Sequence, residues 1–145
     1  MWGTGPRERA GTHQKKQNRL RYHNFIEISG WNPVIAATRM QKSLDYFHSF
    51  QAAFPNHTSI SPHAPYSVSE ALWDCMQPYF SQQIITIHNQ ESQAENELFV
   101  SNTGDFKRLY ALMQIENASF HASGTHSLPA YFNRLQTGKQ IILVH

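Results

Sequence analysis

The sequence has little cysteine, little net charge and no long apolar run. Cys75 is the only cysteine among the 145 residues, so the chain cannot form an internal disulfide, and a reducing cytoplasmic setting is expected. No apolar run approaches the roughly 18 residues that a membrane span needs, and the first residues lack the apolar core of a secretory signal. The formal net charge of +2 is too small to indicate nucleic-acid binding. The expected partner is therefore neither a membrane nor a nucleic acid.

The composition is that of a globular protein with a different first segment. Hydrophobic residues make up 40% of the chain, with nine Phe, six Tyr and three Trp, which suffices for one domain with a core. Residues 1–20 are rich in Gly, Arg and Lys and show no hydrophobic period. We predict a flexible basic leader over 1–20 and one folded domain over 21–145. The leader is interpreted either as a solvated tail or as an arm that binds phosphate or nucleic acid.

Strand-like and helix-like segments alternate along the domain. Apolar, β-branched runs that predict strands begin near residues 25, 57, 84 and 141. Helical patterns are found at 33–47, 71–80, 92–100, 104–113 and 128–135. Alternation of this kind predicts an α/β fold with a parallel sheet and outer helices. The longer gap before the last strand predicts a lid-like insertion.

Three of the nine histidines stand at or near the ends of predicted strands: His63, His88 and His145. Parallel strands bring their carboxyl ends to one rim, where such folds place their chemistry. Glu91 follows His88 by three residues; a neutral imidazole can bind a metal ion, and a nearby carboxylate can move a proton to or from metal-bound water. His63 has the alternative of a loop histidine bonded to the backbone. Glu27 is interpreted equally well as a site carboxylate or as a structural one.

Other polar residues are assigned structural roles. Ser67 and Glu70 match a capping box at the start of the second helix. Glu95, like Glu97, lies in the first turns of the third helix and is expected to complement the helix dipole. His48 is expected at the C-terminal end of the first helix, as a favourable cation or as a surface residue.

Three segments together resemble the amidohydrolase superfamily, in its branch of metal-dependent deaminases and chlorohydrolases. They are Pro62-His63-Ala64-Pro65-Tyr66-Ser67, His88-Asn89-Gln90-Glu91 after its apolar strand, and Leu143-Val144-His145. Their order and approximate spacing match the family over about residues 22–145. The resemblance implies a (β/α)8 TIM barrel, of which this chain would carry about strands three to six with their outer helices.

The resemblance also implies roles for four residues. His88 would be a ligand to one divalent metal ion, Zn²⁺ or alternatively Fe²⁺, and Glu91 would shuttle a proton between metal-bound water and the leaving nitrogen. His145 would orient or deprotonate the attacking water, and His63 would contact the substrate. The implied substrate is a small molecule, an aminopurine, nucleoside or amidine-like compound. A homo-oligomer is a possible state of the full-length enzyme.

The sequence departs from the family pattern at both ends. The first-strand His-x-His metal pair and the last-strand aspartate are absent, and a closed barrel needs about 200 residues or more. We therefore expect an incomplete fragment of a hydrolase of carbon–nitrogen bonds, with little activity on its own. The rival hypothesis is a non-catalytic chain, either a truncated remnant or a small binding module, in which the histidines are structural.

Overall fold

The computed structural model describes residues 21–145, and every structural statement below refers to them. The leader predicted over 1–20 lies outside the described residues. The strands and α-helices are β1 (Asn24–Ile28), α2 (Ala36–Ala53), β2 (Thr58–Pro62), α3 (Glu70–Met76), β3 (Ile84–His88), α4 (Gln93–Ser101), α5 (Asp105–Leu112), α6 (Ser127–Tyr131) and β4 (Gln140–Val144). Short 3-10 turns occupy Pro33–Ile35, Pro65–Ser67, Gln77–Tyr79 and Phe132–Leu135. None of the helices in this part of the chain has the length and apolar character that crossing a membrane requires.

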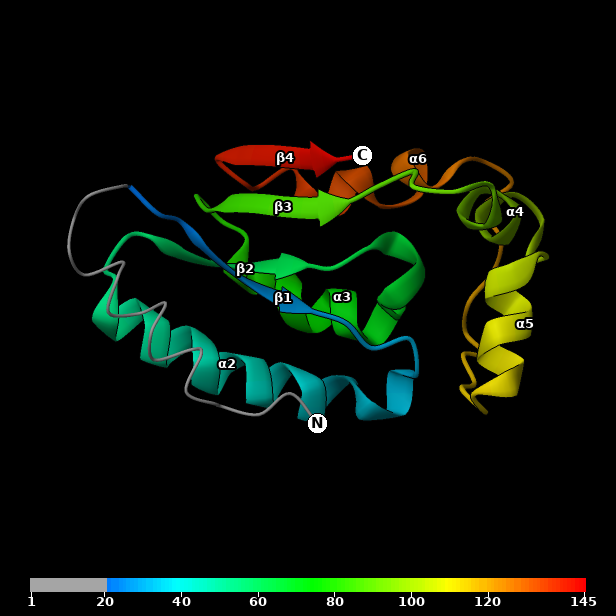
Figure 1. Ribbon diagram of the computed structural model, residues 1–145, viewed down its shortest axis with the longest axis horizontal. Coiled ribbons are helices and arrows are strands. Elements are labelled where there is room, and N and C mark those ends of the chain that lie inside the picture. Colours follow the sequence, from blue (N-terminus) through cyan, green and yellow to red (C-terminus); the bar gives the residue numbers. More distant parts are fainter. Residues whose placement is uncertain (1–20) are drawn as a thin grey trace.

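The strands form two parallel pairs, as the alternation of strands and helices predicts. β1 pairs with β2, and β3 pairs with β4, each in a continuous five-residue register. In Figure 1 the strands follow one another in the order of the chain, and α2 and α3 lie along one side of them. The α/β class is therefore confirmed, whereas the described residues form no closed barrel.

Serine side chains connect the two strand pairs across the β2–β3 junction. The Ser59 hydroxyl donates to the carbonyl oxygen of Ile84 at 2.6 Å, and the Thr86 N–H donates to the Ser61 hydroxyl at 3.1 Å. Beyond β2, the His88 N–H donates to the carbonyl oxygen of His63 at 2.9 Å. These bonds hold β2 beside β3, so the two parallel pairs lie next to each other, although no backbone ladder joins them in the described residues.

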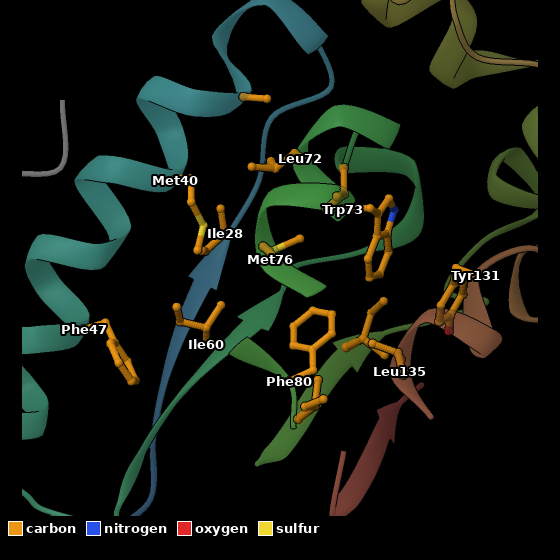
Figure 2. Close-up of a cluster of buried hydrophobic side chains, with 14 residues drawn as sticks. Ile28, Met40, Phe47, Ile60, Leu72, Trp73, Met76, Phe80, Tyr131 and Leu135 are labelled. Carbon is orange, nitrogen blue, oxygen red and sulfur yellow. The ribbon is translucent and has the colours of Figure 1, made fainter. Parts of the chain in front are cut away.

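The main hydrophobic core lies between the strands and the helices α2 and α3. Alternate strand residues, among them Ile85 and Ile87, are fully buried on this side, which is the period of two expected of strands. Figure 2 shows Phe80, Met76 and Leu135 converging on the same cluster from the segments around the sheet. Burial of a side chain of this size contributes about 1.5–3 kcal/mol, so this layer fixes the sheet on which the polar residues stand.

Two helix ends differ from the predictions. The first helix continues to Ala53, so His48 lies inside it and not at its end. The helix can continue this far because residues 34–54 contain no Gly or Pro. The second helix is shorter than predicted and ends at Met76, where Pro78 in the following 3-10 turn lacks the N–H that an α-helix would use.

The predicted capping box at Ser67 is wrong. The N-cap of α3 is Ser69, whose hydroxyl accepts from the Leu72 N–H at 3.4 Å. Ser67 ends a separate 3-10 turn that begins at Pro65, and its hydroxyl is bonded within the loop after β2. The extra turn therefore places the N-cap of α3 at Ser69, two residues after the predicted one, and leaves the Ser67 hydroxyl able to contact His63.

The segment between β3 and β4 lies beyond the carboxyl ends of the strands. Figure 1 shows α4 and α5 there, next to the loop that follows β2. An aromatic satellite core holds this segment to the loop after β1, where Trp31 stacks on Tyr110 with ring centroids 4.9 Å apart. The predicted lid-like role of this insertion stays a prediction, because the contacts described here join it to the loop after β1.

Candidate active site

His88 ends β3 and lies between two carboxylates. Its Nε2 is 3.4 Å from Oε1 of Glu27, which β1 carries, and its Nδ1 is 3.3 Å from Oε1 of Glu91. Nδ1 is buried and has no aligned hydrogen bond, so the Glu91 carboxylate lies close to the ring without a hydrogen bond to it. Of the two interpretations of Glu27, its position favours the site carboxylate.

His63 lies beside His88 at the end of β2. Their ring centroids are 5.3 Å apart, and the His63 Nδ1 is 2.9 Å from the Ser67 hydroxyl. That hydroxyl donates to the Ala64 carbonyl oxygen, so Nδ1 of His63 donates to Ser67 and its Nε2 is left as an acceptor. The partner of the ring is thus a side chain and not the backbone group of the alternative interpretation.

His145 follows β4 and contacts the loop that follows β3. Its Nδ1 is 3.2 Å from the carbonyl oxygen of Asn89, to which only a protonated nitrogen can bond, so Nε2 is the basic nitrogen. The structure brings Glu27, His63, His88 and Glu91 together, and it ties His145 to their neighbour Asn89.

Tyr66 is a member of the cluster that the motif analysis did not single out. Its hydroxyl donates to Oε2 of Glu91 at 2.7 Å, and its ring stacks on Phe106 with centroids 4.2 Å apart. Burial, followed by the hydrogen bond to Glu91, raises the pKa of Tyr66. The phenol therefore stays protonated at neutral pH and remains a donor to the carboxylate.

Glu95 lies in the first turn of α4, as its predicted role of dipole partner requires, and it also bonds the loop before the helix. Its side chain is fully buried, and its two carboxylate oxygens accept from the backbone N–H groups of Gln90 and Glu91, each at 3.1 Å. The Ser92 hydroxyl caps α4 by accepting from the Glu95 N–H at 3.3 Å. The pair Ser92–Glu95 matches the Ser-x-x-Glu capping signature, and this signal was available in the sequence.

Two members of the cluster, Glu27 and His88, line a hollow to which Phe50 of α2 also contributes. The hollow has a volume of about 470 Å³ and is lined by residues that include Glu27, Thr86, His88 and Val144. Its mixed polar and apolar lining is of the kind that accepts a small molecule.

The described residues fit a metal ion only in part. Imidazole and carboxylate are groups that zinc accepts, but a catalytic zinc usually has three protein ligands. Residues 21–145 contain no group of three His, Cys, Asp or Glu side chains able to hold a metal ion. These residues therefore do not complete a metal site, and the chemistry argued below uses their own acid–base groups.

Comparison with known proteins supports the fold. No protein-family model matches the chain, and no curated protein does. Among solved structures, the chain is similar to the aminofutalosine deaminase of Helicobacter pylori, with a TM-score of 0.68 and 17% sequence identity. The match covers 90% of this chain and 38% of that one. At this identity the likeness shows a common fold, and this chain spans well under half of the deaminase.

Proposed function

We propose that this chain carries part of a deaminase-like amidohydrolase, a metal-dependent hydrolase of carbon–nitrogen bonds other than peptide bonds. It would correspond to about strands three to six of a (β/α)8 barrel. The observation that carries the proposal is the meeting of His63, His88 and Glu91 at the carboxyl ends of parallel strands, in a fold shared with a deaminase. In barrels of this kind catalytic groups stand at that end of the strands.

Glu91 is the proposed general acid and base. One carboxylate oxygen is held by the Tyr66 hydroxyl and the other faces His88. The side chain is 36% exposed, so a water molecule or substrate can reach it while these two contacts fix its orientation. A carboxylate placed in this way can take a proton from the attacking water and pass it to the leaving nitrogen.

The two flanking histidines have complementary proposed roles. His145 uses Nδ1 to bond the loop, so its Nε2 would orient or deprotonate the attacking water. His63 uses Nδ1 to bond Ser67, so its Nε2 would accept from an amino or ring N–H of the substrate. Acceptors of this kind fit an aminopurine, a nucleoside or an amidine-like compound.

The proposed cofactor is one divalent metal ion, Zn²⁺ or alternatively Fe²⁺, with His88 as one ligand. Such an ion, when bound, activates water as a nucleophile at neutral pH. The remaining ligands would come from barrel strands outside the described residues. A cytoplasmic location, a homo-oligomeric full-length enzyme and the absence of nucleic-acid and membrane partners also remain predictions.

The alternative is a non-catalytic remnant or small binding module. The incomplete set of metal ligands among the described residues favours it. Under this hypothesis the bond from His63 to Ser67 and the bond from His145 to Asn89 only stabilise the loops that carry these residues. The two hypotheses make different predictions about the DNA on either side of the coding sequence and about the effect of replacing Glu91 on turnover.

The flanking DNA gives the first test. An in-frame upstream strand ending in His-x-His and a downstream strand ending in Asp would supply the missing ligands. The extended protein should then release ammonia from an aminopurine or nucleoside with Zn²⁺ or Fe²⁺, and Glu91→Gln should lower kcat by about 10²–10⁴-fold.

A matched control for the activity test is His121→Gln. His121 is exposed and bonds the Ser119 carbonyl oxygen, outside the cluster, so its replacement should leave turnover unchanged. Unrelated flanking sequence, or an extended protein whose turnover does not depend on Glu91, would leave the non-catalytic alternative standing.

A further inference from the structure

Each of the four residues between His88 and α4, residues 89–92, makes a hydrogen bond that fixes the loop. The Asn89 N–H donates to the Val144 carbonyl oxygen at 2.9 Å, and the Tyr131 hydroxyl donates to the Asn89 side chain. Gln90 adopts a left-handed conformation with φ 54°, which is uncommon for a residue with a side chain. Something must stabilise this turn, because its backbone N–H groups point away from the sheet ladder.

The carboxylate of Glu95 supplies that stabilisation. It is fully buried, and a buried charge is costly unless hydrogen bonds satisfy it. Its hydrogen-bond partners are the N–H groups of Gln90 and Glu91, each at 3.1 Å to a different oxygen. In a common capping box, the third helical residue reaches back to the N–H of the N-cap itself. Here it reaches one and two residues further back, to the residues that set the direction of Glu91.

We propose that Glu95 is a positioning residue that aims the Glu91 carboxylate at His88. This inference rests on the proposed function in one respect, namely that Glu91 is the group whose direction matters. Glu95 itself touches neither the hollow nor His88, so it acts through the backbone of Gln90 and Glu91. Tyr66 then completes the arrangement by fixing the second oxygen of Glu91 from the opposite side.

The variant Glu95→Gln tests this role with the least change in shape. The glutamine amide keeps one acceptor oxygen but replaces the other with an NH₂ group, which faces a backbone donor. The turn should open at one of its two bonds, and the Glu91 side chain should leave His88. Hydrogen exchange of the Gln90 and Glu91 amides should become about tenfold faster or more, since a hydrogen bond to a charged group is worth on the order of one decade in an equilibrium constant.

NMR on the full 145-residue chain gives the decisive readout. In the wild type, a nuclear Overhauser cross-peak should join the His88 ring to the Glu91 side chain, since Nδ1 and Oε1 are 3.3 Å apart. In Glu95→Gln this cross-peak should disappear while the Cα shifts of α4 stay helical. The control Glu97→Gln changes a carboxylate on the same helix that accepts from the exposed Gln93 amide, and it should keep the cross-peak.

A purely structural role for Glu95 as a helix cap makes the opposite prediction. In that case α4 would fray and the His88–Glu91 cross-peak would survive, which would overturn the proposal. Ser92→Ala separates the two roles further, because it removes the bond to the Glu95 N–H and leaves the carboxylate in place. Loss of the cross-peak in Ser92→Ala would assign the effect to the cap and would also overturn it.

The outcome does not depend on whether the protein turns over a substrate. If the extended protein lacks hydrolase activity but the 145-residue chain loses the cross-peak in Glu95→Gln, the proposed function is refuted and the inferred action of Glu95 on Glu91 stands. A cross-peak that persists in Glu95→Gln refutes the inference, whatever the activity of the enzyme.

Discussion

At the scale of single residues, hydrogen bonds decide which nitrogen of a histidine carries the proton. The Ser59 hydroxyl gives its only proton to the Ile84 carbonyl oxygen, so it must accept at 2.9 Å from Nε2 of His23. His23 lies just before β1 and lines the same hollow as Glu27 and His88. Burial, and after it the charge of His57, lower the pKa of His23 below 6.5. The folded protein therefore resists protonation of this ring.

This pKa shift predicts a loss of stability in acid. Because the folded pKa of His23 lies below the unfolded value, the unfolded chain takes up the proton first, and stability falls as the pH falls below about 6.5 through the folded pKa. In His23→Gln, whose amide can still donate to Ser59, the free energy of unfolding should fall less between about pH 7 and pH 5. Urea unfolding at a series of pH values measures both slopes. Equal slopes in the two proteins would contradict the prediction.

At the scale of elements, the junction between β2 and β3 depends on serine hydroxyls. Ser61→Ala should lower the free energy of unfolding by about 1–3 kcal/mol, because it removes the buried hydroxyl that accepts from the N–H of the half-buried Thr86. Ser43→Ala is the control: that exposed hydroxyl bonds a carbonyl oxygen of its own helix, and the change should stay within about 0.5 kcal/mol. Chemical denaturation measures the free energy of unfolding of both variants. Equal decreases in the two would contradict a special role of the β2–β3 junction.

The positions of the strands and helices could be predicted from the sequence, whereas the ends of the helices could not. The strand runs and the helical patterns are visible because burial on one side imposes a period of two or of about 3.6, and β1 to β4 lie where those periods indicate. Helix ends were less predictable: α2 runs on to Ala53, and a local 3-10 turn displaces the cap of α3 to Ser69.

The candidate site follows a similar division. The positions of His63 and His88 at strand ends follow from the pattern, because parallel strands end at one rim. The bonds of Tyr66 and Glu95 do not, since they join residues across loops whose turns no period describes. Only the Ser-x-x-Glu signature pointed to Glu95, and it did not reveal that the carboxylate reaches past the cap to Gln90 and Glu91.

At the scale of the whole molecule, α2 and α3 lie along one side of the strands, and β4 forms an edge. In the described residues β4 pairs with β3 on one edge and has no strand on its other edge. Alternation along β4 sets Ile141 toward the core and Ile142 toward the opposite face. Ile142, Leu143 and Val144 are 38%, 40% and 37% exposed. Exposed apolar residues on a free edge promote association with another strand.

The 145-residue chain is therefore expected to self-associate through β4 as its concentration rises. Ile142→Lys should reduce this association, because a charge on an edge strand opposes pairing with a second chain, while the N–H of residue 142 keeps its place in the β3–β4 register. Leu112→Lys is the matched control, since Leu112 is 83% exposed at the end of α5. Sedimentation velocity over a range of concentrations measures the effect in all three proteins. A wild-type chain that stays monomeric throughout, or an equal effect of both lysines, would show that β4 is not the associating edge.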